Sequence, residues 1–344
     1  GIKPDIHVEQ ERNFFIKSVI EKSTSPEFRA GVRLIGLNTV HPEVFELFDE
    51  SYVFQKPSDA GTTFLENLLG KELVSAPFCN PTVTNFGLSA AICLGFRTVS
   101  LVGVDLGMIK SSEHHSKFSI YKGGVVSAAS SAEFTVKGNL RGEVLTNRTL
   151  DDSRHNIENF LSQLVGVQVF NPNDGAHIRG CVSIRPQDLQ PIEPNSEKQQ
   201  VLQTIFDFCF VREEVKSDKI VRGCLDEFLV EDLSSFLSSI SLPSKGVPQK
   251  SVLELLHEKY KLINDSPVLI QRLVRGAVGY YFSLMMRYTA FASGRNYDLN
   301  YQMVQEHYAR FLDYTNELLT RNLFMKCRLE LKGFDADKEV SQSG

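Results

Sequence analysis

The sequence lacks a pronounced excess of charge of either sign. Its 344 residues include 37 lysines and arginines against 42 aspartates and glutamates, which gives a formal net charge of −5. Proteins that bind nucleic acid or anionic membranes over a broad surface carry a strongly basic face. We therefore expect no nucleic-acid partner, and any basic site must be local.

Paired cysteines and long apolar runs are also missing. The six cysteines form no CxxC pair and lie in apolar contexts, as Cys93 does. Scattered thiols of this kind are typical of reduced core residues in the cytosol. The longest apolar stretch, residues 277–286, is far shorter than the roughly 20 residues that span a bilayer. With no resemblance to a signal peptide at the N-terminus, these absences predict a cytoplasmic protein without a membrane span.

The two glycine-rich phosphate-binding motifs are absent as well. Neither GxGxxG nor GxxxxGK[ST] occurs anywhere in the chain. A doubly wound sheet normally begins with a strand, a glycine-bearing turn and a helix whose N–H groups hold phosphate. Here a predicted strand begins almost at once, at residue 5. Either a preceding segment is missing or the phosphates are held in another way.

The first half of the chain alternates short β-branched runs with helical patterns. Strands are predicted over residues 5–8, 32–37, 52–54, 98–104 and 167–170. The fourth of these is apolar enough to lie centrally in a sheet, and about 60 residues separate it from the fifth, too many for an ordinary loop. The alternation predicts an α/β domain with a mostly parallel sheet over residues 1–184, and the long excursion is a candidate lid or active-site insertion.

Two helices of this domain have recognisable start and stop signals. Asn80 followed by Pro81 is a candidate N-cap with proline in the first turn, and Gly95 ends the same helix. A second helix is expected to be capped near Ser153. In both cases a predicted strand follows directly, which is the order that a parallel sheet requires.

The second half of the chain has a different pattern. Three prolines within residues 185–195 mark a linker. Beyond it, apolar residues recur at helical spacing over residues 197–210, 225–240, 251–263, 267–292 and 300–329. We therefore expect an all-helical domain over residues 196–334, followed by a flexible tail over residues 335–344.

Polar residues follow the predicted strands at several places. Gly103 and Asp105 come after the fourth strand, Glu11 after the first, and a polar turn, residues 171–177, after the fifth. Residues 80–85 offer amide and hydroxyl groups around a predicted helix N-terminus. Because ligands of open α/β sheets bind outside the carboxyl ends of strands, these groups are expected to converge. The alternative is ordinary capping and turn chemistry, including a Glu11 favoured only by a helix dipole.

Adjacent histidines, His114 and His115, stand at the start of the long excursion. Neighbouring residues point in different directions, so the pair is unsuited to sharing one metal ion. Either imidazole can act as a general acid or base near neutral pH. A solvated loop pair is the alternative interpretation.

The ordered combination of these segments resembles the core of the motility accessory factor (Maf) family of flagellin glycosyltransferases, which is MptE-like. The segments are Lys3-Pro4-Asp5-Ile6-His7-Val8-Glu9, Asn80-Pro81-Thr82-Val83, Leu94-Gly95-Phe96, Gly103-Val104-Asp105-Leu106, His114 or His115, Tyr121, and the turn from Asn171 to Gly180. The resemblance covers about residues 1–182. The C-terminal helices fit the family in type only.

The resemblance implies a Rossmann-like catalytic domain akin to sialyltransferases. Such enzymes move a nonulosonic acid, such as pseudaminic or legionaminic acid, from its CMP-activated form to serine or threonine of flagellin. The implied donor is therefore a CMP-sugar, the implied partner is flagellin, and Mg²⁺ is a candidate cofactor. Relatives carry a Gly-Pro-Ser-like turn upstream of the first residue here, so we expect the domain to lack its first strand and phosphate turn.

Roles for individual residues follow as a hypothesis. A base among His114, His115 and Glu11 removes the acceptor hydroxyl proton, and Asp105 organises the nucleotide or a metal ion. The residues expected to bind the nucleotide sugar are Asn80, Thr82, Gly103, Tyr121, Asn171, Asp174 and Gly175. Two alternatives stay open: a diphosphate-transferring kinase, since a related branch contains a pterin pyrophosphokinase, and a non-catalytic adaptor that binds flagellin through the helices.

Overall fold

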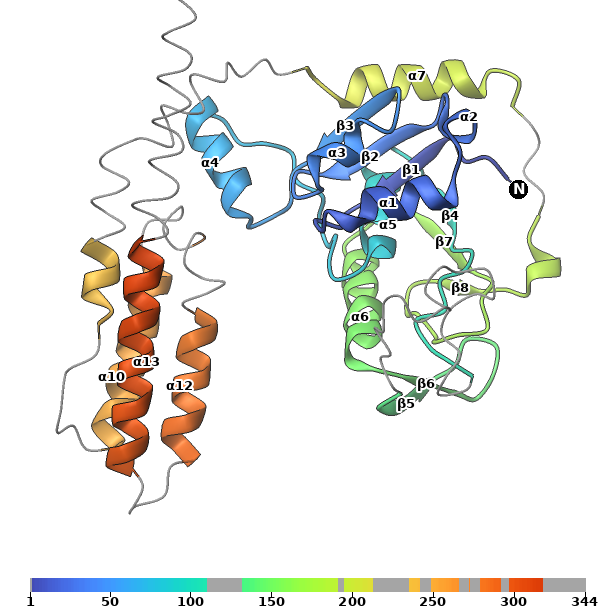
Figure 1. Cartoon of the computed structure of the whole chain (residues 1–344). Coiled ribbons are helices and arrows are strands. Elements are labelled where there is room, and N and C mark those ends of the chain that lie inside the picture. Colours follow the sequence, from blue (N-terminus) through green and yellow to red (C-terminus); the bar gives the residue numbers. More distant parts are fainter. Residues whose placement is uncertain are drawn as a thin grey trace, which may run out of the picture. The chain divides into compact units, whose positions relative to one another are not determined.

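The computed structural model of the chain separates two compact units (Figure 1). The first contains Gly1–Pro57 and Leu73–Arg212, and the second contains Ser58–Glu72 and Glu213–Gly344. The structure describes residues 2–109, 132–190, 195–212, 235–241, 249–265, 272, 279–291 and 297–317. The division differs from the predicted boundary at residues 185–195, because one early helix groups with the second unit and the helix after the linker groups with the first.

The described part of the first unit is a mixed α/β structure with parallel sheets, as the alternating pattern predicted. One sheet has the order β1-β2-β3, a second has the order β4-β7-β8, and β5 and β6 form an antiparallel hairpin. The strands are β1 (Ile6–Glu9), β2 (Arg33–Leu37), β3 (Glu50–Phe54), β4 (Thr98–Ser100), β5 (Phe134–Lys137), β6 (Glu143–Thr146), β7 (Gln168–Asn171) and β8 (Val182–Ser183). The helices are α1 (Phe15–Ser23), α2 (Pro26–Arg29), α3 (Pro42–Phe45), α5 (Val83–Cys93), α6 (Arg148–Ser162), α7 (Lys198–Cys209) and the short 3-10 helix η2 (Pro186–Asp188).

Strand β2 lies at the centre of the first sheet and is buried on both faces. On one face, a Cβ atom added to Gly36 would lie 2.8 Å from the ring of Phe45 in α3. On the other face, the guanidinium of Arg33 lies 5.3 Å from the ring centroid of Phe206 in α7. Since neighbouring side chains of a strand alternate between faces, α3 and α7 cover opposite sides of the sheet. A parallel sheet is normally covered on both sides in this way.

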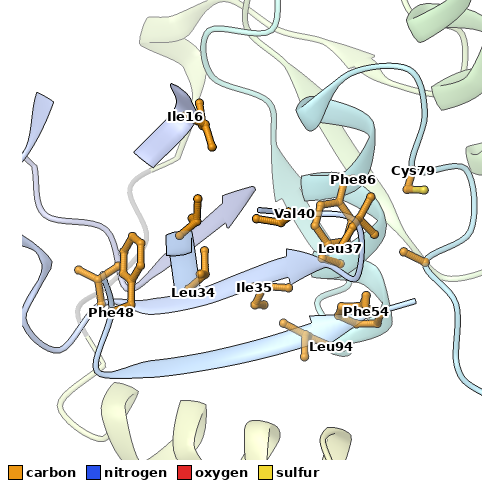
Figure 2. Packing of buried hydrophobic residues seen from close by; sticks show 14 of the residues in the cluster. Ile16, Leu34, Ile35, Leu37, Val40, Phe48, Phe54, Cys79, Phe86 and Leu94 are labelled. Carbon is orange, nitrogen blue, oxygen red and sulfur yellow. The ribbon is translucent and has the colours of Figure 1, made fainter. Parts of the chain in front are cut away.

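Helix α5 joins the two sheets by packing into two hydrophobic clusters. Phe86 and Leu94 belong to the cluster around the first sheet, where they lie beside Leu37 and Phe54 (Figure 2). Ile92 belongs to the cluster formed around the second sheet and α6. A helix that is apolar on all sides is stable only when it is buried. The apolar faces of α5 therefore make one folded unit of the two sheets.

The prediction for the fourth strand was wrong in length. Strand β4 ends at Ser100 and lies at the edge of its sheet, and the side chain of Val102 is 78 % exposed. The chain turns at Gly103, whose φ angle is +77°. The β-branched run over residues 98–104 indicated a long strand, but contacts made by the following turn end the strand early.

Two predicted helix caps were also wrong, one by two residues and the other by about six. Helix α5 is capped by Thr82 and not by Asn80. Helix α6 begins before Ser153, and its cap is Asn147, whose Oδ1 atom accepts a hydrogen bond from the Leu150 N–H at 3.0 Å. Several residues near each helix start are able to cap, and packing against the neighbouring helix decides which of them does.

The described part of the second unit is helical, as predicted for residues 251–263. Helices α4 (Ala60–Leu69), α10 (Gln249–Asp265), α12 (Tyr280–Phe291) and α13 (Tyr297–Glu317) belong to it. The rings of Phe282 and Tyr308 lie 5.4 Å apart in its core, and the Tyr308 hydroxyl donates to the Ile240 carbonyl oxygen at 2.9 Å. Most of residues 225–234, 266–279 and 318–329, and the predicted tail, lie outside the described residues. Among the described helices, none has both the length and the hydropathy needed to cross a bilayer.

The packing of α7 on the first sheet can be tested with two phenylalanines on the same helix. Phe206 is fully buried against Tyr52, at a centroid distance of 4.5 Å, whereas Phe208 is 87 % exposed. We expect Phe206→Ala to lower the free energy of unfolding by about 3–5 kcal/mol. Phe208→Ala should change it by less than about 0.5 kcal/mol. Urea unfolding followed by circular dichroism measures both, and equal effects would contradict this packing.

Candidate functional site

The loops that follow β4 and β7 meet at the carboxyl end of the second sheet. The Ala176 N–H donates to the Asp105 carbonyl oxygen at 2.7 Å. A Cβ atom added to Gly175 would lie 2.0 Å from that same oxygen, so only glycine permits the approach. The Gly103 N–H donates to Asn173 Oδ1 at 2.8 Å. Gly103, Asp105 and Gly175, three of the predicted site residues, are therefore neighbours.

The side-chain amide of Asn173 ties these two loops together. Its Nδ2 atom donates to the carbonyl oxygens of Leu101 at 2.6 Å and Val104 at 3.2 Å, and to Asn171 Oδ1 at 2.8 Å. Asn171, the last residue of β7, is fully buried and also accepts from the Asn173 N–H at 3.1 Å. A primary amide suits this position because it offers donors and an acceptor at once. The network holds both loops in one arrangement.

A third element, the turn of the β5–β6 hairpin, is fastened onto the turn after β7. The Asn139 N–H donates to the Gly175 carbonyl oxygen at 2.8 Å. The Asn139 side chain donates at 2.8 Å to the carbonyl oxygens of Asn171 and Asn173, and accepts from the Ser183 hydroxyl at 2.6 Å. The hairpin is therefore part of the site, although it belongs to neither parallel sheet.

The carboxylate of Asp174 forms a two-point ion pair with Arg141 of the hairpin. Arg141 Nε donates to Asp174 Oδ1 at 2.9 Å, and Arg141 Nη2 donates to Asp174 Oδ2. The hydrogen bond from Arg141 holds the pKa of Asp174 below its ordinary value. The two side chains are 38 % and 40 % exposed, so both are accessible from solvent.

Asp105 is the acid of the site whose pKa is raised. Partial burial of its carboxyl group raises its pKa, and the negative charge of the neighbouring Asp174 raises the pKa further. Both causes favour the neutral form of the acid, yet the residue stays open to solvent. A carboxyl group of this kind at the end of a sheet strand is typical of sites that bind ligands or transfer protons.

The predicted binding residues at the start of α5 are occupied by structural contacts. Thr82 Oγ1 donates to Asn85 Oδ1 at 2.8 Å and lies 3.0 Å from the Ser153 hydroxyl of α6. The buried Asn85 also donates to the Ser153 carbonyl oxygen at 2.9 Å. Thr82 therefore caps α5 and links it to α6. Asn80 is exposed and precedes this cap.

The acidic cluster after β1 is organised around Glu9 and not around Glu11. The buried Glu9 side chain accepts the N–H groups of Gln10 and Glu11, each at 2.8 Å. Glu11 is exposed and accepts the Asn13 N–H at 3.0 Å. It precedes α1, whose first turn contains no acidic residue, so the structure does not show the helix-dipole alternative for Glu11. The Gln10 side chain donates to the Pro81 carbonyl oxygen at 3.0 Å, so the end of β1 lies beside the start of α5.

The structure thus brings together one group of predicted residues, and this group consists of Gly103, Asp105, Asn171, Asp174 and Gly175. Outside this group lie Thr82 and Asn80, at the start of α5, and Glu11, in the segment after β1. His114, His115 and Tyr121 fall outside the described residues. Within the described ranges, no three histidine, cysteine, aspartate or glutamate side chains are placed to hold a metal ion, so Mg²⁺ stays a prediction.

Sequence reasoning missed Asn139 and Arg141 as members of the site. The glycines at 138 and 142 signal a turn, and the structure closes that turn with a hydrogen bond from the Gly138 N–H to the Gly142 carbonyl oxygen at 3.1 Å. Turn chemistry of this kind can predict the hairpin. It carries no information about the distant turn on which the hairpin packs.

Comparison with known proteins agrees with this architecture. Residues 1–111 match the family model described as 6-hydroxymethylpterin diphosphokinase MptE-like. The whole structure is similar to that of the Maf glycosyltransferase from Magnetospirillum magneticum AMB-1, with a TM-score of 0.62 and 19 % sequence identity. The similarity covers 97 % of this chain and 52 % of that one, so this chain spans about half of its length. No curated protein matches the sequence significantly.

These findings confirm the resemblance to MptE-like and Maf proteins. The chain contains an MptE-like domain at its start. Over nearly its whole length it shares the fold of a Maf glycosyltransferase.

The close approach of the two loops predicts a steric test. Gly175→Ala would place a methyl group against the Asp105 backbone, which cannot move aside as a flexible side chain can. We expect this variant to lose about 1–3 kcal/mol of unfolding free energy. Gly142→Ala is the matched control, because nothing lies within 4 Å of its added Cβ atom. If Gly175→Ala were as stable as Gly142→Ala, the contact between the loops would be refuted.

The electrostatics of the site predict opposite effects for its two acids. The raised pKa of Asp105 means that its protonation favours the folded state, a contribution present below the unfolded pKa of about 3.9 and lost as pH rises through the folded pKa. Asp105→Asn should therefore melt at or above the wild-type temperature at pH 7, with the difference vanishing near pH 3.

Asp174 supplies the control with the opposite sign. Its pKa is lowered, so its ionised form stabilises the folded state at neutral pH and that contribution is lost as pH falls. Asp174→Asn should melt below the wild type at pH 7 and approach it in acid. Melting temperatures that fall equally for both variants would contradict the assigned pKa directions.

Proposed function

We propose that the chain is the catalytic part of a glycosyltransferase that moves a nonulosonic acid from a CMP-sugar to serine or threonine of flagellin. The observation that carries this proposal is the extent of the structural similarity to a Maf glycosyltransferase. It covers 97 % of the chain, and so extends through both the α/β unit and the helical unit. The flagellin acceptor and the CMP-sugar donor are expectations taken from the family resemblance.

A Rossmann-like arrangement is the fold that we infer for the first unit. Its sheets have the orders β1-β2-β3 and β4-β7-β8. Setting β1 beside β4 joins them into the doubly wound order, with the reversal of strand order between β1 and β4. Ligands of such sheets bind at the reversal point. The support for this arrangement is that α5 packs into the clusters of both sheets. Polar residues also stand where β1 and β4 end, with Glu9 as the last residue of β1 and Asp105 in the turn after β4.

The proposed reaction assigns the described residues to donor binding. Asp105 organises the nucleotide or a metal ion, and Gly103, with open space beside its backbone, allows the donor to approach closely. Gly175 contributes by letting the turn after β7 pack directly on the Asp105 backbone. A base among His114, His115 and Glu11 takes the acceptor hydroxyl proton. The acceptor oxygen then bonds to the anomeric carbon, the bond from that carbon to the CMP phosphate oxygen breaks, and CMP leaves with the bonding electrons through an oxocarbenium-like transition state.

A diphosphate-transferring kinase is the second candidate function. It is favoured by the match of residues 1–111 to the MptE-like family model. Such an enzyme would bind ATP with Mg²⁺ and not a CMP-sugar. The third possibility, a non-catalytic adaptor for flagellin, requires no nucleotide at all. The three functions therefore differ in the nucleotide that the folded chain binds.

Nucleotide binding separates these functions directly. A ligand that binds only the folded state at a hundred times its Kd stabilises that state by about 2.7 kcal/mol, which is measurable as a rise in melting temperature. We expect CMP and CDP to raise the melting temperature and ATP and GTP to leave it unchanged. A response to ATP with Mg²⁺ alone supports the kinase, and no response to any nucleotide supports the adaptor.

The role of Asp105 is tested by transfer activity. Asp105→Ala should abolish transfer to flagellin while the protein stays folded, because the side chain lies outside the hydrophobic clusters. Asp188→Ala, in η2, is the matched control for loss of one aspartate and should keep full activity. Full activity of Asp105→Ala would refute the assignment.

A further inference from the structure

The turn of the β5–β6 hairpin presents an arginine from a rigid backbone. A Cβ atom added to Gly138 would lie 2.7 Å from the Arg141 carbonyl oxygen, so the turn is tightly folded on itself. The hydrogen bonds of Asn139 to the turn after β7 then fix this turn in place. The His177 N–H also donates to the Lys137 carbonyl oxygen at 2.8 Å. Hydrogen bonds between uncharged groups therefore fix the backbone from which the Arg141 side chain extends.

The ion pair of Arg141 with Asp174 adds little to this stability. Both partners are more than a third exposed, and ion pairs of that kind contribute about 0–1 kcal/mol. The neutral hydrogen bonds around Asn139 already hold the hairpin. The main physical consequence of the ion pair is that it fixes the orientation of the guanidinium group.

Asp174 uses only one edge of that guanidinium. It accepts from Nε and from Nη2. Arginine has five N–H donors, and among the described residues nothing accepts from the remaining donors on Nη1 and Nη2. This second edge is the fork that matches two oxygens of a phosphate or a carboxylate. The side chain is thus held by one anion, and within the described part of the chain its other edge has no acceptor, which leaves it available for a second anion.

The arginine lies in the site already described. The residue after its partner Asp174 is Gly175, whose backbone touches that of Asp105. The charge of Asp174 also acts on Asp105. Arg141 and Asp105 therefore flank the same turn at the carboxyl end of the second sheet.

We propose that Arg141 binds an anionic group of the donor through the free edge of its guanidinium, and that Asp174 is the residue that positions it. The inference rests on the proposed function, since it names the part of the donor that the hairpin recognises. Phosphate and carboxylate share the required pair of oxygens, and a CMP-activated nonulosonic acid contains both. Because Asp174 already balances the positive charge, recognition depends on the fork geometry, which a lysine cannot reproduce.

Isothermal titration calorimetry of the chain with cytidine, CMP and CMP-N-acetylneuraminic acid tests the proposal. If Arg141 binds the phosphate, Arg141→Met should bind CMP about 10- to 100-fold more weakly than the wild type, with cytidine binding unchanged. If Arg141 binds the carboxylate of the sugar, CMP binding should be unchanged, and only the CMP-sugar should bind about 10- to 100-fold more weakly. Either result supports the proposal.

Three variants make the titration decisive. Arg141→Lys keeps the charge and the aliphatic stem but should lose most of the affinity that Arg141→Met loses. Arg179→Met removes another exposed arginine that pairs with a carboxylate, at 3.5 Å from Glu158, and should bind every ligand as the wild type does. Melting temperatures establish that each variant is folded, and Arg141→Lys keeps the test valid if Arg141→Met unfolds.

Two outcomes overturn the proposal. Wild-type affinity of Arg141→Met and Arg141→Lys for CMP and for the CMP-sugar would refute the role of Arg141 and leave the proposed function intact. Failure of the wild-type chain to bind CMP or the CMP-sugar would instead refute the proposed function, and this inference with it.

Discussion

The close approach of two backbones, at Asp105 and Gly175, is the constraint on which the candidate site depends. With no side chain at Gly175, the turn after β7 comes close enough for the Ala176 N–H to bond the Asp105 carbonyl oxygen. The amide of Asn173 then closes the remaining gap between the loops. The hairpin packs on this paired structure through Asn139. A larger residue at Gly175 would separate all three elements, because the clash is with backbone.

The site combines this rigid frame with an unfavourable charge arrangement. Asp105 and Asp174 are two acids on neighbouring turns, and only Asp174 has an arginine partner among the described residues. The raised pKa of Asp105 is the electrostatic consequence. An arrangement that weakens the fold and yet leaves a carboxyl group open to solvent is typical of a functional position, where activity and stability compete. The hydrogen-bond network of uncharged asparagines offsets the unfavourable charge of Asp105.

The two comparisons describe different lengths of the same molecule. The MptE-like match ends at residue 111, shortly after Asp105, whereas the structural similarity to a Maf glycosyltransferase continues into the helical unit. Fold alone does not fix an activity, because one fold carries many chemistries. The choice between a kinase and a glycosyltransferase therefore depends on the polar groups of the site and not on the fold. Arg141 and Asn139 lie beyond residue 111, outside the MptE-like match.

The sequence by itself determined the class of the fold and most of the candidate site. Periodicity identified β1, β2, β3 and β7 to within two residues, because burial on a sheet selects β-branched runs that are visible locally. The rule that ligands bind at the carboxyl ends of strands predicted that Asp105, Asp174 and Gly175 meet at one place, and the structure brings them together. Tertiary structure decided the rest: β4 stops at Ser100, Thr82 and not Asn80 caps α5, and Arg141 joins the site. Each of these depends on contacts between segments far apart in the chain, and local sequence patterns do not record such contacts.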